Sequence, residues 1–267
     1  MKVAVEPDQP AGEFETALLV SRLEKNLEER TVELYALRAE LEAFTHSVSH
    51  DLRGPLMHIG GFADLLLDHA GAQLDDKGRQ YLRTITTSTE QLAAMLTGLG
   101  AYARLSRVEM HPAPVDLGSV VRKAQQETEP KAGNRRVVWL GENLPVVQAD
   151  PALLQQVVTQ LLANALKFTL PREVTRIEVG AQHTGTETIV FVRDNGVGFD
   201  PRHSGNLFGV FQRLHPASAF AGHGLGLASV RRIISRHGGR TWAEGAPGDG
   251  ATFYFSLPEA PTRPHVK

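Results

Sequence analysis

The segment VSRLEKNLEERTVELYALRAELEAFTHSVSHDLRGPL, residues 20–56, decides the fold of the first half of the chain. Its apolar residues recur in alternating steps of three and four, interrupted once by Arg30. They are Val20, Leu23, Leu27, Leu34, Leu37, Leu41, Phe44 and Val48. Because a 3.5-residue repeat keeps one helix stripe against a partner helix, the pattern predicts a coiled coil that leads into a bundle. We expect one long helix over residues 14–68.

A second helical series follows a short turn. The segment HAGAQLDD, residues 69–76, breaks the helical period and offers two aspartates for capping the next helix. The next apolar series is Leu82, Ile85, Leu92, Leu96 and Leu99. Two helices alone would leave these stripes exposed, so we expect a homodimer in which each chain contributes a helical hairpin to a four-helix bundle. The alternative is a monomer whose helices pack onto the second half.

The second half of the chain has a different character, because glycine and proline are sparse before residue 110 and dense after it. Helices are expected over residues 117–129, 151–169 and 225–237. Strands are expected over residues 135–140, 145–148, 176–179, 188–193, 240–243 and 251–257. This mixture predicts an α/β sandwich in which helices cover one sheet.

The composition limits the classes of function. The 267 residues include 28 Lys and Arg and 30 Asp and Glu, a formal charge of −2 that argues against a nucleic-acid-binding protein. The absence of cysteine excludes disulfides, thiolate metal sites and cysteine nucleophiles. No uncharged stretch reaches the ~18 apolar residues of a membrane span, and no secretory signal is recognisable. We therefore expect a cytoplasmic protein without membrane insertion.

The heptad series ends at a histidine that we expect to be exposed. His50 falls at heptad position c, away from the seam, and Asp51 follows it. Pro55 removes one helical hydrogen bond and should bend the helix just below His50, which opens that side chain to a bulky partner. An exposed histidine is usually only a solvated side chain. Zinc binding by His46 and His50 is disfavoured because no third ligand accompanies them.

Two motifs in the second half suit a nucleotide. In LLANALKFT, residues 161–169, Asn164 and Lys167 share a helix face, where an amide oxygen and an ammonium could hold Mg²⁺ and phosphate. In RDNGVGFD, residues 193–200, Asp194 ends a strand and could accept a hydrogen bond from an exocyclic amine such as that of adenine. The ordinary explanations are a polar helix face and an Asn-Gly turn.

A third motif, GHGLGLASV at residues 222–230, opens a helix with glycines. Backbone N–H groups at such a helix start can approach phosphate oxygens, and the helix dipole favours the negative charge. The spacing is G-x-G-x-G, which is neither a Rossmann fingerprint nor a P-loop.

In this order, the motifs over residues 41–257 resemble those of two-component sensor histidine kinases, in which a dimerisation and histidine-phosphotransfer hairpin precedes a Bergerat-type ATP-binding domain. SHDLRGPL resembles the H box of this family, QLLANALKFT the N box, DNGVGF and GHGLGL the two glycine boxes, and LFGVFQRL the phenylalanine box. The C-terminal part resembles kinase modules of phytochrome-like and PAS-type sensors. The resemblance implies an ATP-dependent kinase that phosphorylates its own histidine and passes the phosphate to an aspartate of a response-regulator receiver domain.

The resemblance also implies residue roles. His50 would be phosphorylated and Asp51 would orient its ring, while Asn164 would bind Mg²⁺ and Lys167 and Arg213 would contact the phosphates of ATP. The other implied ATP-binding residues are Asp194, which would recognise adenine, Gly196 and Gly198 beside it, and Gly222, Gly224 and Gly226 in a lid. We expect the regulator to dock around Ile59, Phe62 and Leu66.

Three positions depart from the family pattern. Gln160 replaces a common second asparagine, which could alter metal affinity, and His223 stands where a small threonine is common, which could alter lid closure. Gly54 replaces the threonine or asparagine that dual-function members use to position a water for dephosphorylating the regulator. This substitution leads to the hypothesis of a kinase with weak or absent phosphatase activity.

The motifs divide the chain into a tail (1–15), a coiled-coil helix and hairpin (16–110), an ATP-binding domain (111–258) and a second tail (259–267). Fifteen residues are too few for a sensor domain, so we expect the input from a partner protein or an upstream sensor domain. The alternative function is a non-catalytic ATP-binding dimeric switch or scaffold of the same fold. A gyrase-like or chaperone-like ATPase would lack the exposed histidine on a preceding hairpin.

Overall fold

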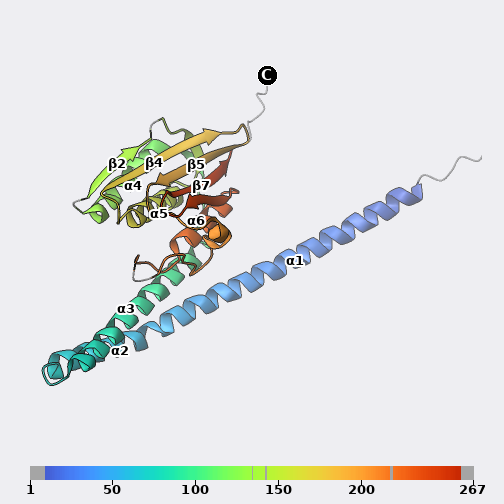
Figure 1. Ribbon diagram of the computed structural model, residues 1–267. Helices are drawn as coiled ribbons and strands as arrows, with labels where there is room; N and C mark the ends of the chain where they lie inside the picture. Colours follow the sequence, from blue (N-terminus) through green and yellow to red (C-terminus); the bar gives the residue numbers. More distant parts are fainter. Residues whose placement is uncertain (1–9, 134, 142, 217–218, 260–267) are drawn as a thin grey trace, which may run out of the picture.

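The computed structural model describes residues 10–133, 135–141, 143–216 and 219–259. It shows a long helical arm followed by an α/β domain (Figure 1). The arm consists of α1 (Pro10–Asp51), α2 (Arg53–Ala70) and α3 (Asp76–Arg104). Helices α2 and α3 pack as a hairpin, and the C-terminal part of α1 packs on α3. Among the described residues, no helix combines the length and the hydropathy needed to cross a bilayer.

The expected helix over residues 14–68 is interrupted at Leu52, so the prediction of a single helix is wrong at this position. Pro55 has no N–H group to donate to the carbonyl of Asp51, and this loss explains the interruption. The neighbouring hydrogen bonds persist, from Leu52 N to Val48 O at 3.1 Å and from Leu56 N to Leu52 O at 3.3 Å. The interruption therefore lies directly after Asp51, three residues before the proline.

The hairpin is tightly packed where small residues meet. Gly60 is buried on α2, and a Cβ atom added to it would lie 2.7 Å from the hydroxyl of Thr89 on α3. The turn before α3 ends at Asp75, whose carboxylate accepts a hydrogen bond from Gly78 N at 2.7 Å. This bond confirms an aspartate N-cap in the predicted turn.

The α/β domain is built on a five-stranded sheet in the order β2-β4-β5-β7-β6. Its strands are β2 (Arg136–Leu140), β4 (Val174–His183), β5 (Glu187–Asp194), β6 (Thr241–Ala246) and β7 (Gly250–Pro258). Strands β2 and β4 are parallel, and the other neighbours are antiparallel. Strand β1 (Ala113–Asp116), which we did not predict, pairs with β3 (Val146–Ala149) in a separate two-stranded sheet.

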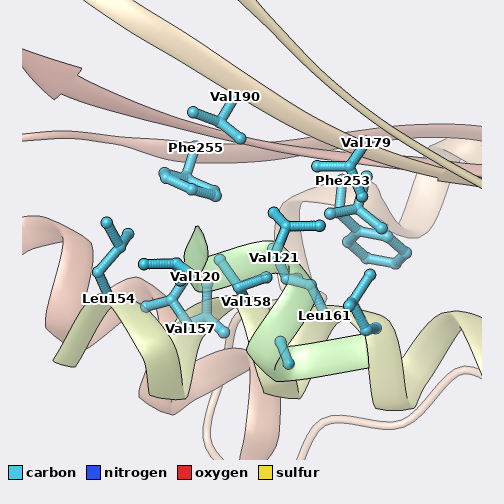
Figure 2. Packing of buried hydrophobic residues seen from close by; sticks show 14 of the residues in the cluster. Val120, Val121, Leu154, Val157, Val158, Leu161, Val179, Val190, Phe253 and Phe255 are labelled. Atoms are coloured by element: carbon cyan, nitrogen blue, oxygen red, sulfur yellow. The ribbon is translucent and has the colours of Figure 1, made fainter. Parts of the chain in front are cut away.

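Helices α4 (Leu117–Thr128), α5 (Pro151–Phe168) and α6 (Gly226–Arg236) accompany the sheet, with the short helices η1 (Glu129–Ala132) and η2 (Pro201–Asn206). Apolar residues of α4 and α5 point toward the sheet and meet Val179, Val190, Phe253 and Phe255 (Figure 2). On α5 the apolar stripe includes Leu154, Val157, Val158 and Leu161, all at most 1% exposed. This core confirms the predicted α/β sandwich.

Helix α6 also joins the domain to the arm. The guanidinium of Arg232 donates to Tyr102 O at 3.1 Å, and its centre lies 4.3 Å from the centroid of the Tyr102 ring. The guanidinium of Arg236 donates to Leu105 O and Val108 O, each at 2.5 Å. Unpaired carbonyls at a helix C-terminus attract cations, so these arginines suit the end of α3.

Candidate functional site

His50 is exposed at the end of α1, as predicted, with 74% of its side chain accessible. Its Nδ1 lies 3.1 Å from Oδ1 of Asp51, and the Ser47 hydroxyl donates to the other carboxylate oxygen at 3.2 Å. The hydrogen bonds from His50 and Ser47 lower the pKa of the Asp51 carboxyl. An ionised carboxylate can only accept, so Nδ1 carries the shared hydrogen in the neutral ring. Nε2 is then left with its lone pair.

A cavity of about 350 Å³ opens in the α/β domain. Four predicted side chains line it, those of Asn164 and Lys167 on α5, Asp194 at the end of β5, and Arg213. Four predicted glycines also line it, Gly198, Gly222, Gly224 and Gly226. The lining does not include Gly196, His50 or Asp51. The structure therefore brings together most of the predicted ATP-binding residues, whereas the histidine lies apart from them on the arm.

The α5 wall of the cavity carries an amide and an ammonium. Asn164 is 6% exposed, and its Oδ1 accepts a hydrogen bond from Gln160 Nε2 at 3.2 Å. Lys167 Nζ lies 4.3 Å from the centroid of the Phe168 ring. Burial, together with the positive charge of Arg213, lowers the pKa of Lys167. Lys167 and Arg213 both line the cavity, and Asp194 supplies the single carboxylate among its described lining residues. The cavity therefore suits an anionic ligand.

Asp194 is the buried acid of the cavity, at 3% exposed. Its Oδ1 accepts a hydrogen bond from Gly196 N at 2.8 Å, while Oδ2 has no partner within the described part of the chain. Burial raises the pKa of this carboxyl to about 6, against the opposing effect of the nearby backbone N–H groups of Gly196 and Ala251. A buried oxygen without a donor is costly. It is a ready acceptor for an N–H group of a ligand.

Two glycines shape the turn after Asp194. A Cβ atom on Gly196 would lie 2.6 Å from Phe168 O and 2.7 Å from the Asp194 carboxylate. Gly198 has φ +63°, and a Cβ atom there would lie 1.9 Å from Ala246 O. Gly198 lines the cavity, whereas Gly196 supports it by letting the turn pass close to the end of α5.

A further part of the lining comes from the lid segment, which we define as residues 207–216 and 219–225. Arg213 is tied within this segment, because its guanidinium donates to Phe220 O at 2.7 Å. The ring of His215 lies 5.4 Å from that of Phe168 and 5.3 Å from that of Phe220, between centroids, and its Nε2 is 3.0 Å from Gly198 O. Sequence reasoning assigned no role in the site to His215 or Phe220.

The glycine-rich start of α6 closes the cavity. Gly222 and Gly224 have φ +143° and +71°, so a side chain at either position would be strained. Helix α6 begins at Gly226 without a side-chain cap on Leu225, which leaves its first N–H groups for a ligand. Leu225 also meets the arm, since a Cβ atom on Gly98 of α3 would lie 2.7 Å from Leu225 Cδ1.

Two family models match separate parts of the chain. Residues 40–107 match the His Kinase A (phospho-acceptor) domain, and residues 149–261 match the histidine kinase-, DNA gyrase B-, and HSP90-like ATPase family. A solved structure of full-length ShkA in complex with AMPPNP is similar, with a TM-score of 0.57 and 28% identity over 82% of this chain and 46% of that chain.

Curated relatives agree with these matches. The chain is 38% identical over 238 residues to the methanogenesis regulatory histidine kinase FilI of Methanothrix harundinacea, covering 89% of this chain and 27% of that protein. It is 34% identical over 247 residues to cyanobacterial phytochrome A of Nostoc sp., covering 90% of this chain and 31% of that protein. The chain thus spans less than a third of the length of either relative. The two matched domains and these relatives show that the chain belongs to the two-component sensor histidine kinases, of the kind associated with phytochromes.

Proposed function

We propose that the chain is an ATP-dependent protein-histidine kinase that phosphorylates His50 and passes the phosphate to an aspartate of a response-regulator receiver domain. The observation that carries the proposal is the hydrogen bond between His50 and Asp51 on an exposed helix end. It holds a nucleophilic nitrogen toward solvent in the same chain as a cavity built for an anion. A non-catalytic switch would not need this arrangement.

ATP fits the chemistry of the cavity. The free oxygen of Asp194 would accept a hydrogen bond from the adenine amine, and the phosphates would lie toward Lys167 and the start of α6. Arg213 would join them after exchanging its bond to Phe220 O for a phosphate oxygen. The amide oxygen of Asn164 would be a ligand for Mg²⁺, which neutralises phosphate charge when bound. Gln160, which bonds Asn164, would hold that amide in place.

The chemical step needs little from the protein beyond positioning. Nε2 of His50 would attack the γ-phosphorus of ATP, forming a P–N bond as the bond to the β,γ-bridging oxygen breaks and ADP leaves. The ring would gain positive charge, which the Asp51 carboxylate beside Nδ1 stabilises. Because His50 lies outside the cavity, the step requires the arm and the α/β domain to approach, within one chain or between two.

A homodimer would cover the apolar surface of the arm. Leu52, the residue before α2, and Ile59 and Leu66 on α2 follow one another at intervals of seven and are 47%, 51% and 48% exposed. On α3, Ile85 and Leu92 are also seven residues apart and are 41% and 47% exposed. Residues at heptad spacing share one side of a helix, so a second hairpin would bury both rows in a four-helix bundle. Ile59 and Leu66, which we expected at the regulator-docking surface, would then lie in the dimer interface. Phe62, 70% exposed, would remain for the regulator.

The remaining features of the proposal come from the sequence. They are the division into residues 1–15, 16–110, 111–258 and 259–267, an input from an upstream sensor domain or partner, and a cytoplasmic location. We expect no nucleic-acid partner.

The test is incubation of the purified chain with Mg²⁺ and γ-labelled ATP. We expect acid-labile, alkali-stable label on the wild-type chain and none on His50→Gln. His58→Gln, which removes another exposed histidine on α2, is the matched control and should keep the label. Label that persists in His50→Gln would contradict the assignment of His50. Tight ATP binding without any label would instead support the non-catalytic switch.

A further inference from the structure

Arg172 lies in the connection from α5 to β4, outside the cavity. Its backbone N–H donates to Thr169 O at 2.9 Å, which anchors it to the end of α5. Its guanidinium reaches the turn after Asp194, where Nε donates to Asn195 O at 2.8 Å and Nη2 donates to Gly196 O at 2.9 Å. Nη2 also donates to Gly248 O, in the connection from β6 to β7.

The three carbonyl groups converge on one cation. Carbonyl oxygens facing a common point repel one another unless a donor lies between them, and the planar fork of arginine supplies donors in several directions. Lysine has a shorter reach and a single nitrogen, so it can satisfy this arrangement only in part. Arg172 thus fastens α5, the turn at residues 194–198 and the β6–β7 connection to one another.

This arrangement bears directly on Asp194. The N–H of Gly196 donates to Asp194 Oδ1 at 2.8 Å, while the carbonyl of Gly196 accepts from Arg172. By holding the Gly196 carbonyl, Arg172 also holds the turn that carries the Gly196 N–H. Because this N–H bonds Oδ1 of Asp194, Oδ2 is the oxygen that stays free. The opposite side of the turn is fixed independently, because Asn195 Nδ2 donates to Val174 O at 3.0 Å and Val197 N donates to Phe168 O at 3.1 Å.

We propose that Arg172 is a positioning residue for base recognition, which holds the turn at residues 194–198 so that Asp194 Oδ2 faces the amine of adenine. The inference rests on the proposed function, since it assumes that adenine occupies the cavity. Arg172 is not among the residues that line the cavity, so it would not touch the nucleotide. Its effect is therefore on recognition of the base and not on phosphoryl transfer.

The test compares ATP with purine riboside triphosphate, which lacks the exocyclic amine, as ligands of the purified chain. Arg172→Met should weaken ATP binding about tenfold, as expected for one disturbed hydrogen bond to a charged group, and leave the analogue within about twofold. Arg172→Lys should fall between. In the phosphorylation assay, KM for ATP should rise while kcat stays within about twofold. Arg202→Met, which removes an exposed arginine bonded to Asp200 nearby, is the matched control.

The outcomes separate the two proposals. A wild-type chain that does not distinguish ATP from the analogue would contradict adenine recognition itself. A wild-type chain that does distinguish them, with an Arg172→Met variant that distinguishes them equally, would overturn the role of Arg172. An equal loss of affinity for both ligands would also overturn it, because that is the result of general loosening. If Arg172→Met does not fold, the ratio of the affinities for ATP and the analogue is measured on Arg172→Lys instead, and the same criteria apply.

Discussion

Replacing Asp194 by asparagine should raise the free energy of unfolding of the ligand-free protein above that of wild type. The increase should be larger at neutral pH than in acid. The carboxyl is 3% exposed and its pKa is raised by burial from 3.8 to about 6. At about 1.36 kcal/mol per unit, the ionised form costs about 3 kcal/mol of stability above pH 6. Asparagine keeps an oxygen for the bond from Gly196 N and carries no charge.

The sign follows from proton linkage. The native state binds the Asp194 proton more tightly than the unfolded state, so wild-type stability falls as pH rises from about 3.8 to about 6. The asparagine variant lacks this titration. The difference in unfolding free energy, variant minus wild type, should therefore increase by about 2 kcal/mol between pH 4.5 and pH 7.5. All other titrating groups are common to both proteins and cancel.

Urea unfolding followed by tryptophan fluorescence is the appropriate assay, because Trp139 on β2 and Trp242 on β6 are the two tryptophans of the sequence and both lie in the sheet. A parallel titration with ATP should show at least about a hundredfold weaker binding, since the amide presents a donor to the adenine amine. A difference in unfolding free energy that is the same at both pH values would refute the reasoning. So would ATP binding that is unchanged.

Two further variants test the arm. Gly54→Thr should fold, because a Cβ atom at this position meets nothing within 4 Å. It should dephosphorylate a phosphorylated receiver domain several-fold faster than wild type and the control Gly54→Ala do. Rapid dephosphorylation by wild type would contradict weak phosphatase activity. Ile85→Glu should be a monomer in sedimentation, because it places a charge in the proposed apolar interface. The control Leu65→Glu, outside the row of Leu52, Ile59 and Leu66, should stay dimeric. Equal behaviour of the two variants would place the interface elsewhere.

The sequence predicted the fold well where a periodic pattern was strong. The apolar stripe of α5 predicted residues 151–169, and the helix spans Pro151–Phe168. Strand β1 was missed because Pro114 lies within it and proline usually argues against a strand. Strand β4 was predicted only over residues 176–179 but spans Val174–His183, since its end near Gln182 and His183 is exposed and polar. Pairing with β5, which the local pattern does not encode, extends it.

The site was predictable to the extent that its residues act through motifs. A carboxylate at a strand end followed by closely spaced glycines pointed to Asp194, and the cavity gathers it with Asn164 and Lys167. Arg172 could not be found in this way, because it bonds backbone carbonyls of Asn195, Gly196 and Gly248. Such a contact depends on where the chain passes in space, and any residue type can supply a carbonyl. Residues that hold a recognition turn through its backbone therefore require the structure, even where the recognising side chain itself is apparent from the sequence.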